Sequence, residues 1–349
     1  MASSGIIGWF ETLGLGDRAE VGGKGGSLGE LTRAGIAVPP GFVIKTAAFE
    51  EFMRALESQT PVRARVAALR AGDLAAIREC SGELRARLLA AELPPGVAAE
   101  LSAAHGALCE RAGGENVAVR SSATTEDASD ASFAGLQDTY LWVGDAAATL
   151  DRVRSCWASL YSVESISYRR DRNIAEDEVA MAVVVQSMVD ARAAGVMFTR
   201  SPTSGDVSVV TIEGAWGLGS AVVGGEVTPD RWVLGKITGE ISVRDISDKH
   251  IEHRRASGGG VEAVAVPEER RRAPCLTDAE LGELRQIARR VERHYGCAQD
   301  IEWAIDSHGA LRLLQSRPET VWSAKDAQPA ARVAADPLSH LMTIFGGRR

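Results

Sequence analysis

The chain has 349 residues, 45% of them hydrophobic, which is enough for a sizeable core and two or three subdomains. Its formal net charge of −8 and its pI near 5.4 argue against a nucleic-acid partner, because tracking a phosphate backbone requires a basic excess. We expect no membrane partner either, since no apolar run reaches about eighteen residues. The N-terminal MASSGIIGWF lacks the basic start of a signal peptide, and the five cysteines are scattered, so we expect reduced thiols and a cytoplasmic location.

The first motif is a glycine-rich loop around Lys24, in the sequence VGGKGGSLGEL at 21–31, directly before an expected helix. Glycines let backbone N–H groups approach an anion, and the lysine adds a positive charge. The lysine is followed by two glycines, so the spacing does not match a Walker-type P-loop. Taken alone, the loop fits either a phosphate-binding turn or the ordinary start of a helix.

A helical region is expected at 46–112, which is rich in Ala, Leu, Arg and Glu at helical spacing. It is followed by an apolar strand at 117–119 that ends in Arg120, and then by a stretch of small residues that includes Gly135 and Thr139. An arginine after a strand is often a surface residue. Here the small residues that follow also allow close folding over a phosphate chain.

The next elements are expected from hydrophobic period and punctuation. Strands are expected at 140–143, 179–185, 195–198 and 207–213, and one long helix around 150–172. Thr277 and Glu280 form a capping box for a further helix, which Gly296 closes.

The hairpin at 300–320 carries the most informative polar residues. Asp300 and Glu302 lie on its first strand, Gln315 and Arg317 on its second, and 307–309 form the turn. Carboxylate and amide oxygens suit a hard divalent cation, and a planar guanidinium suits polyphosphate, so the hairpin predicts a Mg-nucleotide site. The alternative is a hairpin with ordinary polar residues on its solvent face.

Five blocks of the sequence carry a resemblance to a known family. They read VGGKGGSLGELTRAGIAVPPGFVI, VRSSATTEDASDASFAGLQDTYLWV, VVVQSMVDARAAGVMFTRSP, IEGAWGLGSAVVGGEVTPD and QDIEWAID followed by LLQSRPET. In this order the chain resembles the nucleotide-binding domain of phosphoenolpyruvate synthase, pyruvate phosphate dikinase and rifampin phosphotransferase, over about residues 15–322.

The resemblance implies an α+β fold of the ATP-grasp type, in which two α+β subdomains hold ATP, with a helical N-terminal portion. We expect a first subdomain at 1–185, which contains the lysine loop, the helical region and the arginine/glycine loop. The second subdomain, at 186–322, is expected to hold the nucleoside and Mg²⁺ site. Residues 323–349 are expected to form a linker and a possible docking tail.

The resemblance also implies roles for residues at matching positions. Lys24 and Arg120 would bind the phosphates and take part in catalysis. Gly135 and Thr139 would form the loop over the phosphates, and Gln186 would contact the nucleoside.

The metal and transfer residues are implied in the same way. Glu302 and Gln315 would bind Mg²⁺, Arg317 would steady the transferring group, and Asp300 would assist it, so the last two are catalytic candidates. The family commonly reads G-L-G-E where this chain has G-L-G-S, ending at Ser220. The role of that position in metal binding is therefore open.

In the resembling family, phosphate passes from ATP to a histidine in a T-S-H-A type motif on a separate domain. None of the six histidines here has such a setting, and His308 falls in the expected hairpin turn. We therefore expect the ATP-binding subunit of a split phosphotransferase. It would pass the β-phosphoryl group of ATP to a histidine on a partner subunit, with AMP and phosphate as products. The layout resembles phenylphosphate synthase, with a phenol bound by the partner as acceptor.

Two alternatives remain for the function. The first is an ATP-binding fragment of a phosphoenolpyruvate synthase or rifampin phosphotransferase type enzyme. The second is a non-catalytic nucleotide-binding regulatory module. The segment at 323–336 is rich in Ala and Pro and is followed by PLSHLMTIF. It is either a frayed terminus or a docking peptide for the partner.

Overall fold

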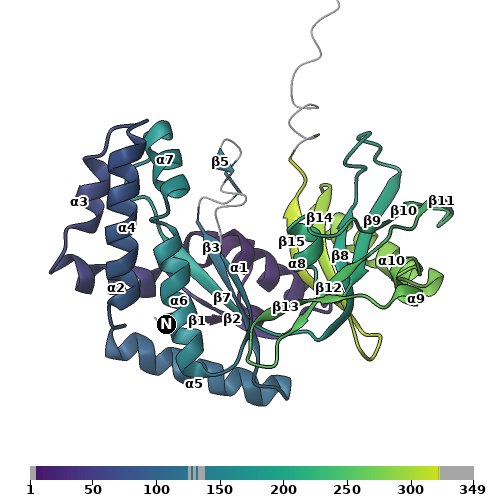
Figure 1. The fold of residues 1–349 in the computed structure, drawn as a ribbon, viewed down its shortest axis with the longest axis horizontal. Helices are drawn as coiled ribbons and strands as arrows, with labels where there is room; N and C mark the ends of the chain where they lie inside the picture. Colours follow the sequence, from purple (N-terminus) through teal and green to yellow (C-terminus); the bar gives the residue numbers. More distant parts are fainter. Residues whose placement is uncertain (1–4, 125–126, 129–130, 133–137, 321, 323–349) are drawn as a thin grey trace, which may run out of the picture.

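The computed structural model describes residues 5–124, 127–128, 131–132, 138–320 and 322. It confirms the α+β class and has two lobes, each built on one antiparallel sheet (Figure 1). The sheet of the first lobe has the order β1 (Ile7–Trp9), β2 (Gly41–Ile44), β7 (Met181–Ser187), β3 (Val117–Ala123) and β6 (Thr139–Val143). The sheet of the second lobe has the order β11 (Ile241–Asp245), β10 (Asp230–Gly235), β9 (Val209–Trp216), β8 (Ala191–Phe198), β14 (Gln299–Asp306) and β15 (Leu311–Pro318).

Two short hairpins complete the strands, β4 (Asp127–Ala128) with β5 (Ala131–Ser132) and β12 (Ile251–Arg255) with β13 (Val261–Ala265). The long helices are α1 (Arg18–Arg33), α2 (Thr46–Glu57), α4 (Leu74–Ala90), α5 (Pro95–Ala112), α6 (Ala146–Ser159), α7 (Val163–Arg172) and α10 (Asp278–Tyr295). The short helices are η1 (Phe10–Thr12), η2 (Leu15–Asp17), α3 (Val62–Ala67), α8 (Ser220–Val223) and α9 (Glu268–Arg271). The expected helical region is confirmed as α2 to α5, and none of the helices in the described part of the chain is long and apolar enough to cross a membrane.

The two faces of the first sheet are covered differently. Phe42, Val119 and Val185 pack into a large core with α2 to α7. Val43 and Val184 point to the opposite face, where they pack against α1. Because alternate residues of a strand face opposite sides, each strand of this sheet supports both layers.

Helix α1 connects the two lobes. Its residue Leu28 packs on the first sheet, whereas Leu31 belongs to the core of the second lobe. The Ser27 hydroxyl donates to the carbonyl of Ser316 on β15 at 2.6 Å, between residues 289 positions apart. A helix that carries the lysine loop is therefore fixed to the strand that carries Gln315 and Arg317.

The sequence predicted one long helix around 150–172, and this prediction is wrong. The helix ends at Ser159, and α7 starts after Ser162, whose backbone is extended and whose hydroxyl accepts from the N–H of Ser165 at 3.1 Å. A serine N-cap of this kind satisfies a free N–H group and starts a new helix. Arg169 then reaches back and donates to the carbonyl of Leu160 at 2.6 Å, which closes the turn between the two helices.

Local signals near the hairpin are confirmed. Thr277 and Glu280 form the expected capping box of α10, and Gly296 ends it with φ of 69°. The chain leaves the first sheet at Ser187 and enters the second at Ala191. The subdomain boundary at 185/186 remains a prediction.

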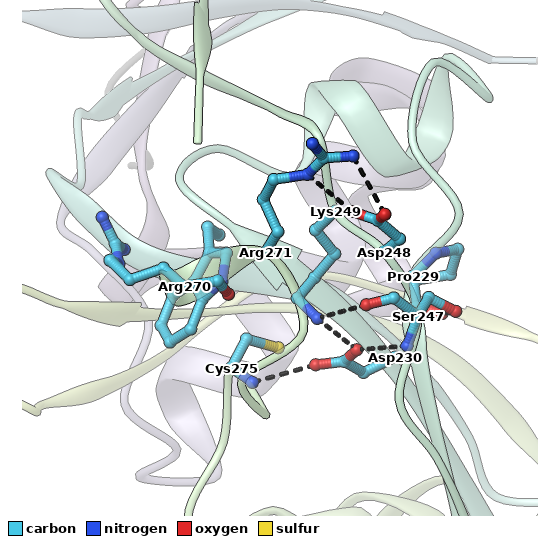
Figure 2. A network of polar contacts seen from close by, with 9 residues as sticks. Pro229, Asp230, Ser247, Asp248, Lys249, Arg270, Arg271 and Cys275 are labelled. Atoms are coloured by element: carbon cyan, nitrogen blue, oxygen red, sulfur yellow. Dashed lines mark hydrogen bonds and ion pairs between the residues drawn. The ribbon is translucent and has the colours of Figure 1, made fainter. Parts of the chain in front are cut away.

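A buried polar network holds the segment that leads into β12 (Figure 2). The Lys249 ammonium and the Asp230 carboxylate form an ion pair with both side chains fully buried. The other Asp230 oxygen accepts from the N–H of Cys275 at 2.9 Å. Every oxygen of this buried carboxylate therefore has a donor, which is the condition under which a buried charge is tolerated.

Candidate nucleotide and metal site

A cavity of about 350 Å³ lies between the two lobes, within the size range of small-molecule sites. The first lobe contributes β3, β6 and the end of β7, and the second lobe contributes β8, α8 and β14. Four residues predicted from the sequence line it, namely Arg120, Thr139, Gln186 and Glu302. They are up to 182 positions apart in the chain, so the fold alone brings them together.

Arg120 crosses the cavity from one lobe to the other. Its side chain is only 11% exposed, and Nη2 donates to Oε2 of Glu302 at 2.8 Å while Nη1 donates to the carbonyl of Leu314 at 2.9 Å. In this arrangement the guanidinium and the carboxylate neutralise each other. Because a phosphate chain attracts the arginine and a cation attracts the glutamate, a Mg-nucleotide complex offers better partners to both.

The hairpin β14–β15 places the other predicted residues in two rows on one face of the sheet. Glu302 lies directly opposite Gln315, and Asp300 lies directly opposite Arg317. The Nε atom of Arg317 is 3.5 Å from Oδ2 of Asp300. The predicted hairpin is thereby confirmed, with its turn at 307–309, and the four side chains form one polar surface.

Burial changes the acid–base behaviour of Asp300. Desolvation raises the pKa of its carboxyl to about 6, and the nearby Arg317 guanidinium opposes this shift. The Oδ1 atom is buried and has no hydrogen-bond partner. A carboxyl with a perturbed pKa beside the site is typical of functional positions.

Gln186 and Thr139 lie on the wall of the cavity in the first lobe. Gln186 is 2% exposed and its amide donates to the carbonyl of Pro39 at 3.3 Å, which fixes the side chain at the end of β7. Beside it the cavity is apolar, with Leu141 and Met188 among its lining. A mostly apolar wall with a few fixed polar groups suits a flat apolar ring that makes a few hydrogen bonds.

The lysine loop lies beyond the end of the cavity lining rather than in it. Helix α1 is kinked at Gly22, which has φ of 70°, so Lys24 stands in the first turn after the kink. The loop packs on β3, where the Ser122 hydroxyl donates to the carbonyl of Val21 at 2.8 Å. Ser122 is two positions beyond Arg120, which places the lysine loop next to the arginine strand.

Gly135 lies outside the described residues. Ser220, at the position where the family has a glutamate, lines the cavity, and its hydroxyl shares a hydrogen bond of 2.8 Å with Nδ1 of His253. The other ring nitrogen of His253 is 3.4 Å from a carboxylate oxygen of Glu226. The hydrogen bond to His253 therefore holds the Ser220 side chain against β12.

Sequence reasoning missed several residues of the site. The connector after Gln186, at 187–189, and the residue Val223 of helix α8 both line the cavity; they lie within the blocks that resemble the family, but no role was predicted for them. Glu213 was also missed. It shares the face of Glu302, because Val196 lies between them and pairs with both, and burial raises the pKa of its carboxyl.

Comparison with known proteins decides the family. Residues 18–336 match the pyruvate phosphate dikinase AMP/ATP-binding domain. This chain belongs to that family. The expected family and the ATP-grasp-type α+β fold are thereby confirmed, and the match supports ATP as a ligand of the domain.

Several enzymes contain a region that is similar in sequence to this chain. A probable phosphoenolpyruvate synthase of Methanothermobacter thermautotrophicus is 44% identical over 316 residues, which cover 90% of this chain and 46% of that protein. A rifampicin phosphotransferase of Streptomyces sp is 43% identical over 303 residues, 86% of this chain and 34% of that protein. The phosphoenolpyruvate synthase of Pyrococcus furiosus is 36% identical over 356 residues, with coverages of 90% and 44%. The chain spans less than half the length of these relatives.

The polar surface also fits a magnesium ion bound together with nucleotide. Among the described residues, no group of three or more His, Cys, Asp or Glu side chains gathers into a protein-only metal site. Mg²⁺ commonly keeps waters and binds through one or two protein oxygens plus the phosphates of its nucleotide. Glu302 and Gln315, which face each other across β14–β15, supply one carboxylate and one amide oxygen of this kind.

Proposed function

We propose that this domain is the ATP-binding subunit of a split phosphotransferase. It passes the β-phosphoryl group of ATP to a histidine on a partner subunit, and the products are AMP and phosphate. The single observation that supports this best is the Arg120–Glu302 pair, which crosses the cavity between the lobes at 2.8 Å. It brings together a guanidinium, which suits a phosphate chain, and a carboxylate, which suits a hard cation.

The roles of the residues follow from their chemistry. Glu302 and Gln315 would hold Mg²⁺, which neutralises phosphate charge when bound. Arg120 would exchange its carboxylate partner for a phosphate oxygen, and Lys24 would add a second positive charge from the loop beside β3. Arg317, whose side chain is 53% exposed, would meet the phosphoryl group as it leaves. Preorganised cations of this kind lower the barrier because the negative charge shifts during transfer.

The acceptor nitrogen would come from the partner. In the proposed reaction the histidine nitrogen bonds to the β-phosphorus, AMP leaves with the electrons of the broken bond, and water takes the γ-phosphoryl group as phosphate. The six histidines of the chain do not supply an obvious carrier, and His308 lies in the turn between β14 and β15. The final acceptor in our proposal is a phenol bound by the partner, and the compartment is the cytoplasm.

A second candidate function is supported by the lengths of the relatives. Because this chain spans 46% of one phosphoenolpyruvate synthase and 34% of the rifampicin phosphotransferase, it also fits the ATP-binding part of such an enzyme. The C-terminal stretch at 323–349, which we propose as a docking tail, lies outside the described residues.

Affinity capture from the native source tests the proposal. We expect a separate histidine-domain protein to co-purify and the mixture to convert ATP to AMP and phosphate when a phenol is added. Recovery of a single longer polypeptide that contains this sequence would favour the second candidate. Conversion of ATP to ADP instead of AMP would contradict both.

A further inference from the structure

A second cavity, of about 400 Å³, lies against β12, and four arginines line it. They come from three elements, with Arg192 on β8, Arg254 and Arg255 on β12 and Arg270 on α9. We call this cavity the arginine pocket. It shares Ala191 and Leu218 with the cavity between the lobes that Arg120 and Glu302 line, which we call the nucleotide cavity, so the two cavities lie next to each other. In a chain with a net charge of −8, such a concentration of guanidinium groups requires an explanation.

A buried carboxylate organises two of these arginines. The Glu252 side chain is 2% exposed, and its Oε1 atom is 2.5 Å from Nη2 of Arg254 and 3.6 Å from Nη1 of Arg270. The same Arg270 guanidinium lies over the ring of Trp216, with 4.4 Å to the centroid. Figure 2 shows the Arg270 side chain directed away from the Asp230–Lys249 network, whereas Arg271 turns to Asp248. One buried carboxylate is thus the shared counter-ion of two guanidiniums.

The arginines of the pocket have more N–H donors than the described residues provide acceptors. A guanidinium offers five N–H donors, and within the described part of the chain Arg255 contacts only the ring of Trp142, at 5.1 Å, which accepts no conventional hydrogen bond. Arg192 is the exception, because it donates to the carbonyl of Cys275 at 3.1 Å and pairs with Glu280. Asp190 is exposed on the rim and adds one carboxylate. The donors of Arg254, Arg255 and Arg270 therefore outnumber the acceptors that the described residues provide.

We propose that the arginine pocket binds the phosphate group of a small ligand, at a site distinct from the nucleotide cavity. A phosphate group presents several acceptor oxygens to the arginine fork, and Arg–phosphate pairs are frequently bidentate. The ligand is inorganic phosphate or a phosphate monoester, since both offer the same group.

The pocket also lies where the lobes touch. Trp142 belongs to β6 of the first lobe, and its carbonyl accepts from the N–H of Gly260, at the tip of the β12–β13 hairpin, at 3.4 Å. Trp142 has φ of 57°, an unusual conformation for a residue with a side chain. Its buried Nε1 atom has no hydrogen-bond partner among the described residues. A ligand on Arg255 would therefore act on the hairpin that bridges the lobes and would change nucleotide affinity. This coupling rests on the proposed function, whereas phosphate binding itself does not.

Equilibrium dialysis with ³²P-labelled inorganic phosphate tests the site. We expect saturable binding to the full chain and at least a tenfold loss of affinity in the double variant Arg254→Gln, Arg255→Gln. Arg272→Gln removes the same charge from a side chain that is 81% exposed and outside the pocket, and Arg120→Gln removes it from the nucleotide cavity. Arg272→Gln should bind phosphate as the unmodified chain does, and Arg120→Gln should keep the saturable binding that the double variant loses.

Glu252→Gln gives a test of opposite sign. Removing the shared negative charge frees Arg254 and Arg270, so phosphate affinity should rise in this variant. Competition by unlabelled glycerol 3-phosphate would identify a monoester as the preferred ligand, and its absence would identify inorganic phosphate. Binding that is absent, that is lost only in Arg120→Gln, or that is equal in the double variant would overturn the proposal. Mg-ATP affinity measured on the same double variant separates this result from the proposed function, because its nucleotide cavity is intact.

Discussion

At the scale of single residues, the Arg120–Glu302 ion pair spans the cavity between the lobes, and we expect a bound Mg-nucleotide to separate the two side chains. Arg120 and Glu302 satisfy each other in the described structure, although each is suited to a different part of a Mg-nucleotide complex. The pair costs little to break when both members gain new partners. It costs more when only one does, because the other charge is then left partly buried without a counter-ion.

Glu302→Gln tests the metal role directly. The amide keeps an acceptor for Arg120 but loses the negative charge that a hard cation prefers. We expect Mg-ATP affinity to fall by about tenfold or more, which corresponds to about 1.4 kcal/mol. Affinity for ATP without Mg²⁺ should change little. Calorimetry on this variant and on Glu283→Gln, an exposed position on α10, provides the comparison. Equal Mg²⁺ dependence in all three proteins would refute the assignment.

Arg317→Ala separates binding from transfer. The side chain is half exposed and contacts Asp300 at 3.5 Å, so the fold does not depend on it. If it acts on the departing phosphoryl group, phosphoryl transfer to the partner should fall by a factor on the order of 10³. Mg-ATP affinity should fall far less. Single-turnover rates together with calorimetry measure both, and a loss confined to binding would show that Arg317 acts only on the ground state.

At the scale of elements, the kink in α1 sets the position of the lysine loop. Gly22 has φ of 70°, and a Cβ there would lie 2.2 Å from the carbonyl oxygen of Ser122. Gly22→Ala should therefore lower the free energy of unfolding by about 1–3 kcal/mol and displace the loop. Gly16→Ala is the matched control, since a Cβ at that position meets no atom within 4 Å. Denaturant titration of both variants measures the difference, and equal stability would show that the kink relaxes freely.

The contact between α1 and α10 predicts a pH dependence of stability. The hydrogen bond from His294, at 2.7 Å, lowers the pKa of the Glu30 carboxyl, and burial opposes it. A carboxyl with a lowered folded pKa stabilises the fold above its unfolded pKa and loses that contribution as the pH falls through the folded value. In Glu30→Gln the free energy of unfolding should be lower by about 0.5–1 kcal/mol at neutral pH. The difference should shrink as the pH falls below the ordinary pKa of about 4.5, and a constant difference there would contradict the linkage.

Local patterns predicted the elements whose signals lie within a few residues. The capping box at Thr277 and the turn at 307–309 were predicted correctly, because neighbouring residues determine them. The strand expected to end in Arg120 is present, but it continues to Ala123. The break between α6 and α7 could not be predicted, since the hydrophobic spacing continues through Ser162. The helix itself is interrupted there, because Ser162 is the N-cap of α7.

At the scale of the whole molecule, candidate site residues could be predicted from the sequence, but their pairing could not. No local pattern indicates that Arg120 meets Glu302, that Leu31 packs in the core of the second lobe, or that Ser220 bonds to His253. Contacts between residues so far apart are set by the packing of complete sheets and helices. The resemblance to a known family supplied the roles, and the structure supplied the distances.

The proposed phosphotransferase divides its function between two polypeptides, one that binds ATP and one that carries the histidine. Incubation of the isolated chain with ATP that carries ³²P in the β-position tests it most directly, followed by the same incubation with a histidine-domain partner. We predict that the isolated chain binds the nucleotide and acquires no acid-labile label, and that the partner becomes labelled as AMP is released. Stoichiometric acid-labile label on this chain without a partner would contradict the account, because one of its own six histidines would then carry the phosphate.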